Sequence, residues 1–155
     1  MSHIVIKLRK SLYSLLGLFV IALPALAWAA AQTPESIPGA TVVTAENAKS
    51  MVEQGMLIVD TRVANEYVEQ HFKGAVNVPY KEKSEKSVDF DPNLDSFDLS
   101  LLPADKNTSM IMYCNAGECW KSYKATKSVV KAGYRNVYWL RGGIPEWKAK
   151  GFPVE

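Results

Sequence analysis

Cysteine and histidine are scarce in this chain, because its 155 residues include only two of each. Two cysteines allow at most one internal disulfide, so the sequence excludes a small protein built on a disulfide framework. We expect no cofactor and no metal, since two cysteines without a nearby histidine make a poor ligand set. Charge is nearly balanced, with 18 Lys and Arg against 16 Asp and Glu, and gives no reason to expect a nucleic-acid partner. Hydrophobic residues make up 48% of the chain, which is enough for the core of one domain.

The N-terminus differs from the rest of the chain. Residues 1–31 carry three basic residues and no acidic one, and a dense apolar stretch covers residues 15–23. Pro24 follows, and Ala27-Trp28-Ala29 places small residues at the −3 and −1 positions of a cleavage site. This pattern predicts a secretory signal peptide over residues 1–29, with cleavage after Ala31 as the alternative. An uncleaved membrane anchor is the other interpretation, since the uncharged run is just long enough to span a bilayer.

Cleavage would leave about 126 residues in an oxidising compartment, which in a bacterium is the periplasm. Those residues hold 15 basic and 16 acidic side chains, and both cysteines remain. We expect a polar lead at 30–41 and a single domain at 42–155. No membrane contact is expected after cleavage.

The expected domain alternates strands with helices. Thr44 is a plausible N-cap for the first helix, and Gly55 ends it. Continuous apolar runs are typical of strands buried on both faces. Residues 80–108 are polar and irregular, and the mixed charges at 81–91 predict a solvated loop. This order favours an α/β fold with a parallel sheet covered by helices on both faces. The expected strands are 56–59, 75–78, 109–113 and 136–140, and the expected helices are 45–54, 64–70, 120–132 and 144–150.

The chemistry-bearing residues gather where the third expected strand meets the helix at 120–132. Ligands of open parallel sheets bind beyond the carboxyl ends of the strands, and Cys114 stands there. Backbone N–H groups of the following loop and the helix dipole would stabilise a thiolate and lower the pKa of Cys114. Gly117 would allow the turn, Lys121 would add positive charge and Glu118 would oppose it. The arrangement suits a nucleophile that carries an anion, such as a persulfide or a covalent phosphate.

Two other interpretations of the cysteines stay open. Cys114 could be an inert buried residue, or it could form a disulfide with Cys119. If the loop points its N–H groups inward, its side chains point outward and the two sulfur atoms diverge.

Residues 42–154 resemble a single rhodanese-like domain, through several motifs in the family's order and spacing. With the signal segment, the chain looks most like the secreted, single-domain periplasmic rhodaneses. The motifs are Asp60-Thr61-Arg62 with Glu66-Tyr67, then His71 with 74–79 (GAVNVP), then Tyr113-Cys114 with Gly117, then Gly133-Tyr134, Val137, Leu140, Gly142-Gly143 and Trp147, and finally 151–154 (GFPV).

The resemblance implies a parallel sheet of about five strands and a sulfurtransferase activity. Cys114 would attack the outer sulfur of a donor such as thiosulfate, release sulfite, hold a persulfide and pass the sulfur to cyanide or a thiol. Asp60 and Arg62 would pair near the loop in a structural role. The loop that would bind the substrate comprises Asn115, Ala116, Gly117, Glu118, Cys119, Trp120 and Lys121.

The loop also departs from the family pattern. Many members run C-x-x-G-x-R-S, whereas Cys119 stands here at the Arg position and Trp120 at the Ser position. Losing that Arg weakens the case for thiosulfate, because Arg binds such anions in a bidentate manner, although Lys121 supplies a point charge.

Cys119 therefore suggests two further interpretations besides the enzyme. It could resolve a persulfide or sulfenate on Cys114 in a periplasmic carrier or redox partner that serves an acceptor protein. A Cys-Trp pair also occurs in the C-x-x-C-W motif of rhodanese-like proteins linked to quinoprotein oxidation systems, at a shorter spacing than here. The last interpretation is a non-catalytic domain of the same fold that binds a partner.

Overall fold

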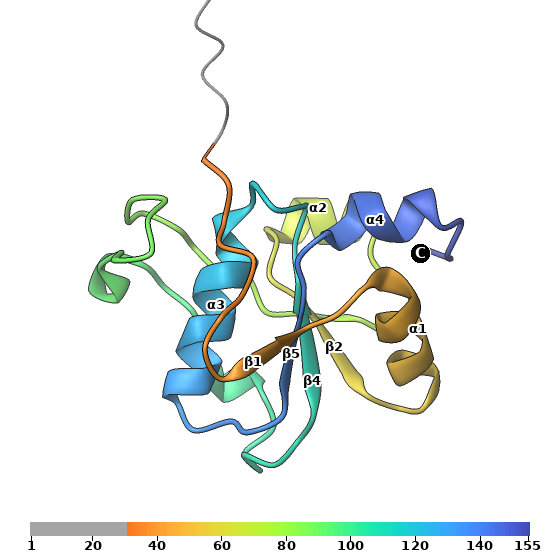
Figure 1. Cartoon of the computed structure of the whole chain (residues 1–155), viewed down its shortest axis with the longest axis horizontal. Helices are drawn as coiled ribbons and strands as arrows, with labels where there is room; N and C mark the ends of the chain where they lie inside the picture. Colours follow the sequence, from red (N-terminus) through yellow and green to blue (C-terminus); the bar gives the residue numbers. More distant parts are fainter. Residues whose placement is uncertain (1–30) are drawn as a thin grey trace, which may run out of the picture.

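The computed structural model describes residues 31–155, so the signal peptide expected at 1–29 lies outside the described residues. A five-stranded, all-parallel sheet forms the centre of the molecule, in the order β1-β5-β4-β2-β3 (Figure 1). The strands are β1 Ala40–Val42, β2 Leu57–Asp60, β3 Val76–Asn77, β4 Met110–Tyr113 and β5 Val137–Leu140. The helices are α1 Ala45–Glu53, α2 Ala64–Glu69, α3 Trp120–Lys131 and α4 Gly143–Ala149, with 3-10 turns at Pro92–Leu94 and Leu99–Leu101.

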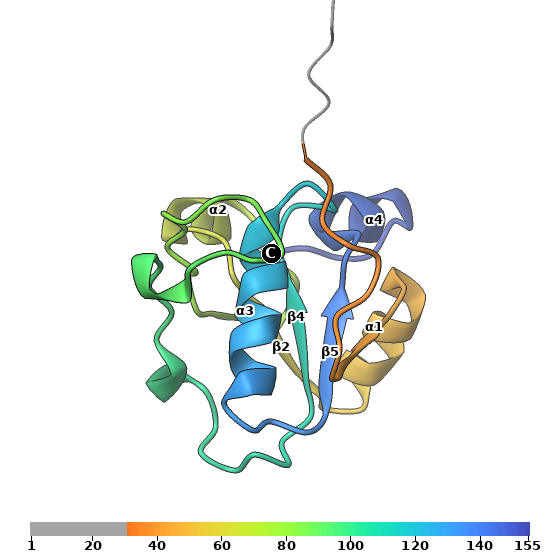
Figure 2. The same ribbon diagram turned by 60° about the vertical axis from the view of Figure 1, so that its left-hand side comes forward.

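Helices cover both faces of this sheet, because its central strands are apolar on both sides. On one face, Ile58 and Ile111 of the strands pack with Ala48 of α1 and Trp147 of α4. On the other face, the neighbouring strand residues Val59 and Met112 pack with Ala125 and Val129 of α3. Figures 1 and 2 show α3 on one side of the sheet and α1 and α4 on the other. The predicted fold class is thus confirmed.

Most expected elements are present within one or two residues of their predicted ends. The Thr44 side chain caps α1 by accepting a hydrogen bond from the Asn47 amide, as expected. Strand β1, which lies at the end of the expected polar lead, was not predicted. Its three residues are mostly exposed, and they become a strand only by pairing with Val137–Trp139 of β5.

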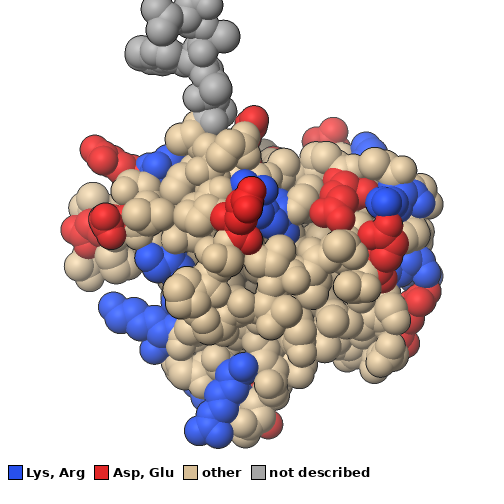
Figure 3. Space-filling model, in the orientation of Figure 1, with Lys and Arg blue, Asp and Glu red and all other residues tan. Residues whose placement is uncertain are grey.

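The segment at 81–91, expected to be a solvated loop, is only partly so. Ser84 is buried, and Glu82 pairs with Lys124 of α3. On the face shown in Figure 3, acidic and basic side chains are interspersed. Among residues 31–155, no helix is long and apolar enough to cross a bilayer.

Candidate functional site

The loop that joins β4 to α3 stands at the carboxyl end of the sheet, where ligands of parallel sheets bind. We call residues 114–120 the thiol loop. It begins at Cys114, directly after β4, and ends where Cys119 caps α3 with extended backbone angles. The Cys119 amide donates to the Ala116 carbonyl and closes the turn between them. Both cysteines are free thiols in the described structure.

Cys114 lies at the floor of the loop, with only 1% of its surface exposed. Its sulfur lies 3.2 Å from the Cys119 carbonyl oxygen and 2.9 Å from Ser122 Oγ. The indole N–H of Trp139 donates to the same Ser122 oxygen at 2.9 Å. Burial raises the pKa of Cys114 well above its ordinary value, and the neighbouring Cys119 raises it further. The lowered pKa expected for Cys114 is therefore wrong, because desolvation outweighs the hydrogen bond between Cys114 and Ser122.

Cys119 occupies the more open position and has the opposite shift. A hydrogen bond with the Cys114 thiol lowers the pKa of Cys119 to about 6. Burial opposes this shift, while the backbone N–H groups of Asn115 and Lys121 and the Lys121 charge support it. The two cysteines thus lie close together, with the Cys114 sulfur 3.2 Å from the Cys119 carbonyl oxygen. Backbone N–H groups act on both sulfur atoms, those of Asn115 and Lys121 on Cys119 and that of Ser122 on Cys114.

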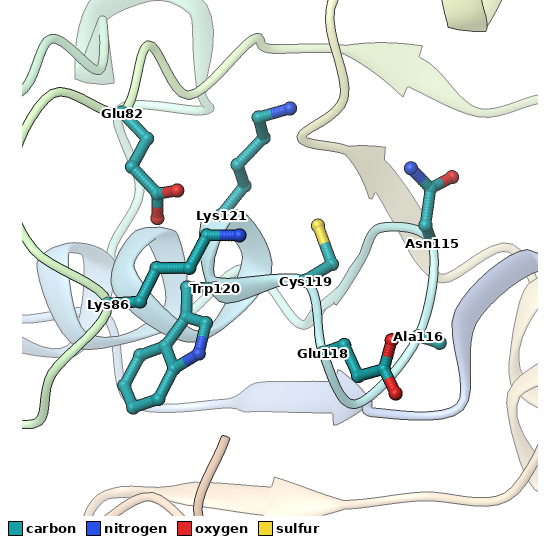
Figure 4. Close-up of a pocket in the computed structure, with 8 residues that line it drawn as sticks. All are labelled: Glu82, Lys86, Asn115, Ala116, Glu118, Cys119, Trp120 and Lys121. Carbon is teal, nitrogen blue, oxygen red and sulfur yellow. The ribbon is translucent and has the colours of Figure 1, made fainter. Parts of the chain in front are cut away.

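A pocket of about 320 Å³ opens beside Cys119. In Figure 4 the Cys119 sulfur points into the space between Lys121 and Asn115. Two of the expected site residues, the catalytic candidate Cys114 and the loop residue Gly117, are not among those that line this pocket. The lining comprises Asn115, Ala116, Glu118, Cys119, Trp120 and Lys121 from the loop and helix, and Glu82 and Lys86 from the segment after β3.

The outer side of the thiol loop is covered by residues 31–37, which were expected to be a polar lead. The amide and hydroxyl of Thr33 both donate to the Gly117 carbonyl at 2.7 Å. Arg141 holds Thr33 in turn, through a 2.8 Å bond to its carbonyl. Trp120 donates its indole N–H to the Ala31 carbonyl at 2.8 Å. This segment therefore fixes the loop through bonds to Gly117 and to Trp120.

Two glycines permit close approaches around the thiol loop. A Cβ at Gly117 would stand 3.0 Å from Gln32 Oε1 and 3.1 Å from Arg141, so little space is left for a side chain at this position. The freer backbone expected of Gly117 is not used, since the residues with positive φ do not include it. Gly143 does have a positive φ of 52°, and a Cβ there would lie 2.1 Å from the Cys114 carbonyl oxygen. The start of α4 can thus press against the loop, where Ile144 donates to that oxygen.

Asp60 and Arg62 form a buried ion pair below the thiol loop, at the end of β2. Arg62 Nη2 lies 2.6 Å from Asp60 Oδ2, and the Tyr113 hydroxyl donates to the same oxygen at 2.7 Å. Arg62 also donates to the Gln70 carbonyl at 2.6 Å. The expected pairing is present, and neither residue lines the pocket. Their structural role stays a prediction.

A second buried charge cluster, which the sequence reasoning missed, holds the opposite wall of the pocket. The Lys124 ammonium lies 3.0 Å from Glu82 Oε2, 2.8 Å from Ser84 Oγ and 3.7 Å from Asp95 Oδ2. Asp95 also accepts bonds from Tyr80 and Ser84, whose hydrogen bonds overcome burial and lower its pKa to about 2. One signal could have revealed this cluster, because Lys124 falls on the apolar face of the helix at 120–131, four residues after Trp120.

Comparisons with known proteins agree with this architecture. The model of the "Rhodanese-like domain" matches residues 44–150. The protein HIGH ARSENIC CONTENT 1, mitochondrial, of Arabidopsis thaliana is 27% identical over 77% of this chain and 68% of its own length. The tRNA uridine(34) hydroxylase of Buchnera aphidicola is 34% identical over 67% of this chain, but the match spans only 30% of that relative. The BH2092 protein of Bacillus halodurans has a similar structure, with a TM-score of 0.57 and 23% identity over 75% of this chain and 77% of its own.

The family match covers well over half of the chain, and its range includes the thiol loop, both cysteines and the Asp60–Arg62 pair. The structural likeness independently supports the fold. The chain therefore belongs to the rhodanese-like domain family, and that membership implies chemistry of the sulfurtransferase type.

Proposed function

We propose that this protein moves sulfane sulfur from an anionic donor such as thiosulfate to a thiol or cyanide, through a persulfide on the thiol loop. One observation carries the proposal: a half-buried thiol lines a pocket at the carboxyl end of the sheet, beside inward N–H groups and two lysines. A persulfide anion needs such donors, because a buried negative charge is costly without them.

The charges of the pocket support an anionic donor of small size. Lys86 and Lys121 both line it, and Lys121 contributes to the lowered pKa of Cys119. Two lysines offer point charges where many family members have one bidentate Arg. Glu82 and Glu118 line the same pocket, which disfavours a donor with a large negative charge.

The test is sulfite release from thiosulfate with a dithiol or cyanide as acceptor. We expect turnover by the reduced wild-type protein and only background release by the double variant Cys114→Ser/Cys119→Ser, since no nucleophile remains. The variant Ser50→Ala, on the exposed face of α1, serves as a matched control and keeps full activity. Wild type that releases no sulfite, although both thiols titrate as free, would refute the proposal.

A second candidate function is a periplasmic persulfide carrier or redox partner that discharges to a dedicated acceptor protein. The closeness of the two cysteines favours it, because a neighbouring thiol can resolve a persulfide. With thiosulfate and cyanide, a carrier gives a burst of about one equivalent of sulfite and then almost no turnover. Steady turnover with cyanide supports the enzyme instead.

A further inference from the structure

Two carbonyl groups of the thiol loop accept hydrogen bonds from outside the loop. At its start, the Cys114 carbonyl accepts a bond from the Ile144 amide at 3.1 Å. Further along, the Gly117 carbonyl accepts bonds from both the amide and the hydroxyl of Thr33, each at 2.7 Å. A carbonyl oxygen has two lone pairs, so these two donors together fix the direction of the Gly117 carbonyl.

A carbonyl held in this way also sets the direction of the next N–H group. In a trans peptide, the C=O of one residue and the N–H of the next point to opposite sides. The peptide between Cys114 and Asn115 shows the result. Its carbonyl is bonded to Ile144, and its N–H acts on the sulfur of Cys119.

The Glu118 N–H is the corresponding group further along the loop. It shares a trans peptide with the Gly117 carbonyl, which is bonded to Thr33, so this N–H points away from Thr33. Within residues 31–155, no protein oxygen accepts a hydrogen bond from it. The Glu118 side chain lines the pocket beside Cys119. The Glu118 N–H is therefore a donor that an anion bound at the loop can use.

Thr33 is itself fixed by Arg141, from the turn between β5 and α4. Arg141 Nη2 donates to the Thr33 carbonyl at 2.8 Å, and Nε donates to the Pro34 carbonyl at 3.0 Å. Only 3% of the Thr33 surface is exposed, so water competes little for its two donors. Figures 1 and 2 both show the N-terminal segment beside the loop between β4 and α3. Thr33 precedes residues 44–150, so the family match does not account for this contact.

We propose that Thr33 and Arg141 are positioning residues for sulfur transfer, because they hold the Gly117 carbonyl so that the Glu118 N–H faces the anion bound at the thiol loop. This inference rests on the proposed function, since that anion is the sulfur donor or the persulfide. Neither Thr33 nor Arg141 lines the pocket, so both act through the peptide between Gly117 and Glu118. One donor aimed at a developing negative charge is worth about 10²–10³ in rate, and a misdirected donor loses part of this.

The rate of sulfite release from thiosulfate, with cyanide as acceptor, tests these roles on the reduced full chain. Arg141→Met frees Thr33, so kcat/KM should fall about tenfold. Thr33→Val removes one of the two donors to the Gly117 carbonyl and should lower kcat/KM about threefold. Thr33→Ser keeps the hydroxyl and should stay within about twofold of wild type. The matched control Arg135→Met removes an exposed arginine and should equal wild type.

The amide proton resonance of Glu118 gives a readout that a purely structural role would not move. In isotope-labelled wild type, the product anion sulfite should shift this resonance downfield until the site is saturated. In Arg141→Met the shift at saturation should be much smaller. The wild-type titration needs no variant, so a poorly folded Arg141→Met does not remove the test.

Two results overturn the positioning role and leave the proposed function standing. One is a kcat/KM of Arg141→Met that equals that of Arg135→Met. The other is a Glu118 resonance in the wild type that sulfite does not move, although other amides of the loop respond. Wild type that releases no sulfite from thiosulfate, with both thiols free, refutes the proposed function and this inference with it.

Discussion

Two buried charge clusters support the thiol loop from opposite faces of the sheet, and they differ in how far apart their members lie in the chain. Asp60 and Arg62 are two residues apart and share a face with Ile58. Lys124 lies on α3, across the sheet, and its partner Ser84 is 40 residues away. The comparison shows that an ion pair between neighbouring residues can be recognised from a sequence motif. An ion pair between distant residues can be recognised only from the tertiary structure.

The clusters also differ in their relation to the pocket. The Asp60–Arg62 pair ends in bonds to Tyr113 and Gln70 and does not line the pocket. The Lys124 cluster includes Glu82, which does. We therefore expect the first cluster to govern stability, and the second to govern stability and substrate binding together.

The largest expected effect is that of Arg62→Ala on the free energy of unfolding. The change leaves Asp60 buried without its partner, and such a loss costs about 3–5 kcal/mol. Urea denaturation measures it. The matched control Arg135→Ala removes an exposed arginine and should shift stability by under about 0.5 kcal/mol. A cost for Arg62→Ala as small as that of the control contradicts the assignment.

Lys124→Met should destabilise the protein less than Arg62→Ala does, but it should weaken thiosulfate binding more. Asp95 keeps its bonds from Tyr80 and Ser84, so we expect a loss of about 1–3 kcal/mol in the free energy of unfolding. The KM for thiosulfate should rise, because Glu82 loses its ion pair with α3. Steady-state kinetics measure the KM, and denaturation curves measure the free energy of unfolding. The control is Lys131→Met, on the same helix. An unchanged KM would show that the Lys124 cluster, like the Asp60–Arg62 pair, does not influence substrate binding.

The second cluster should also determine part of the acid sensitivity. The pKa of Asp95 is about 2 in the folded protein, below its ordinary value of 3.8, because Ser84 and its neighbours hydrogen-bond the carboxylate. Its ionised form therefore stabilises the fold above pH 4, and this contribution is lost as pH falls from about 4 to about 2. Melting temperatures across that range should fall less steeply in Asp95→Asn than in wild type. The exposed control Asp105→Asn should follow wild type.

The smallest effect should come from Lys86→Ala, at the pocket mouth. This exposed charge steers and holds an anion weakly, so the KM for thiosulfate should rise by about threefold while kcat stays unchanged. Added salt should reduce the difference, since it screens exposed charges. Lys83→Ala, an exposed lysine that does not line the pocket, is the control. Equal effects of both substitutions would show that Lys86 has no specific role.

Sequence reasoning succeeded where the determining contacts are local. Continuous apolar runs revealed the central strands, and Thr44 marked the start of α1. The thiol loop followed from one short motif after a strand. β1 was missed because its pairing with Val137–Trp139 lies far along the chain. For the same reason Thr33, Lys86 and Glu82 gave no signal, since each reaches the loop only through the tertiary fold. The order of the two cysteine pKa values depends on the burial of Cys114 and on the hydrogen bonds to Cys119, and neither can be inferred from the motif.

The hydrogen bonds that connect Cys114 through Ser122 to Trp139 have an optical consequence. An indole emits at a wavelength and intensity that depend on its polar neighbours, and the Trp139 N–H is bonded to the hydroxyl that contacts the Cys114 sulfur. If that sulfur changes from a thiol to a disulfide, the Ser122 hydroxyl must reorient its hydrogen bonds. The polar environment of the Trp139 indole then changes as well. We therefore expect the fluorescence of Trp139 to change when Cys114 is oxidised, a change that can be measured without any added label.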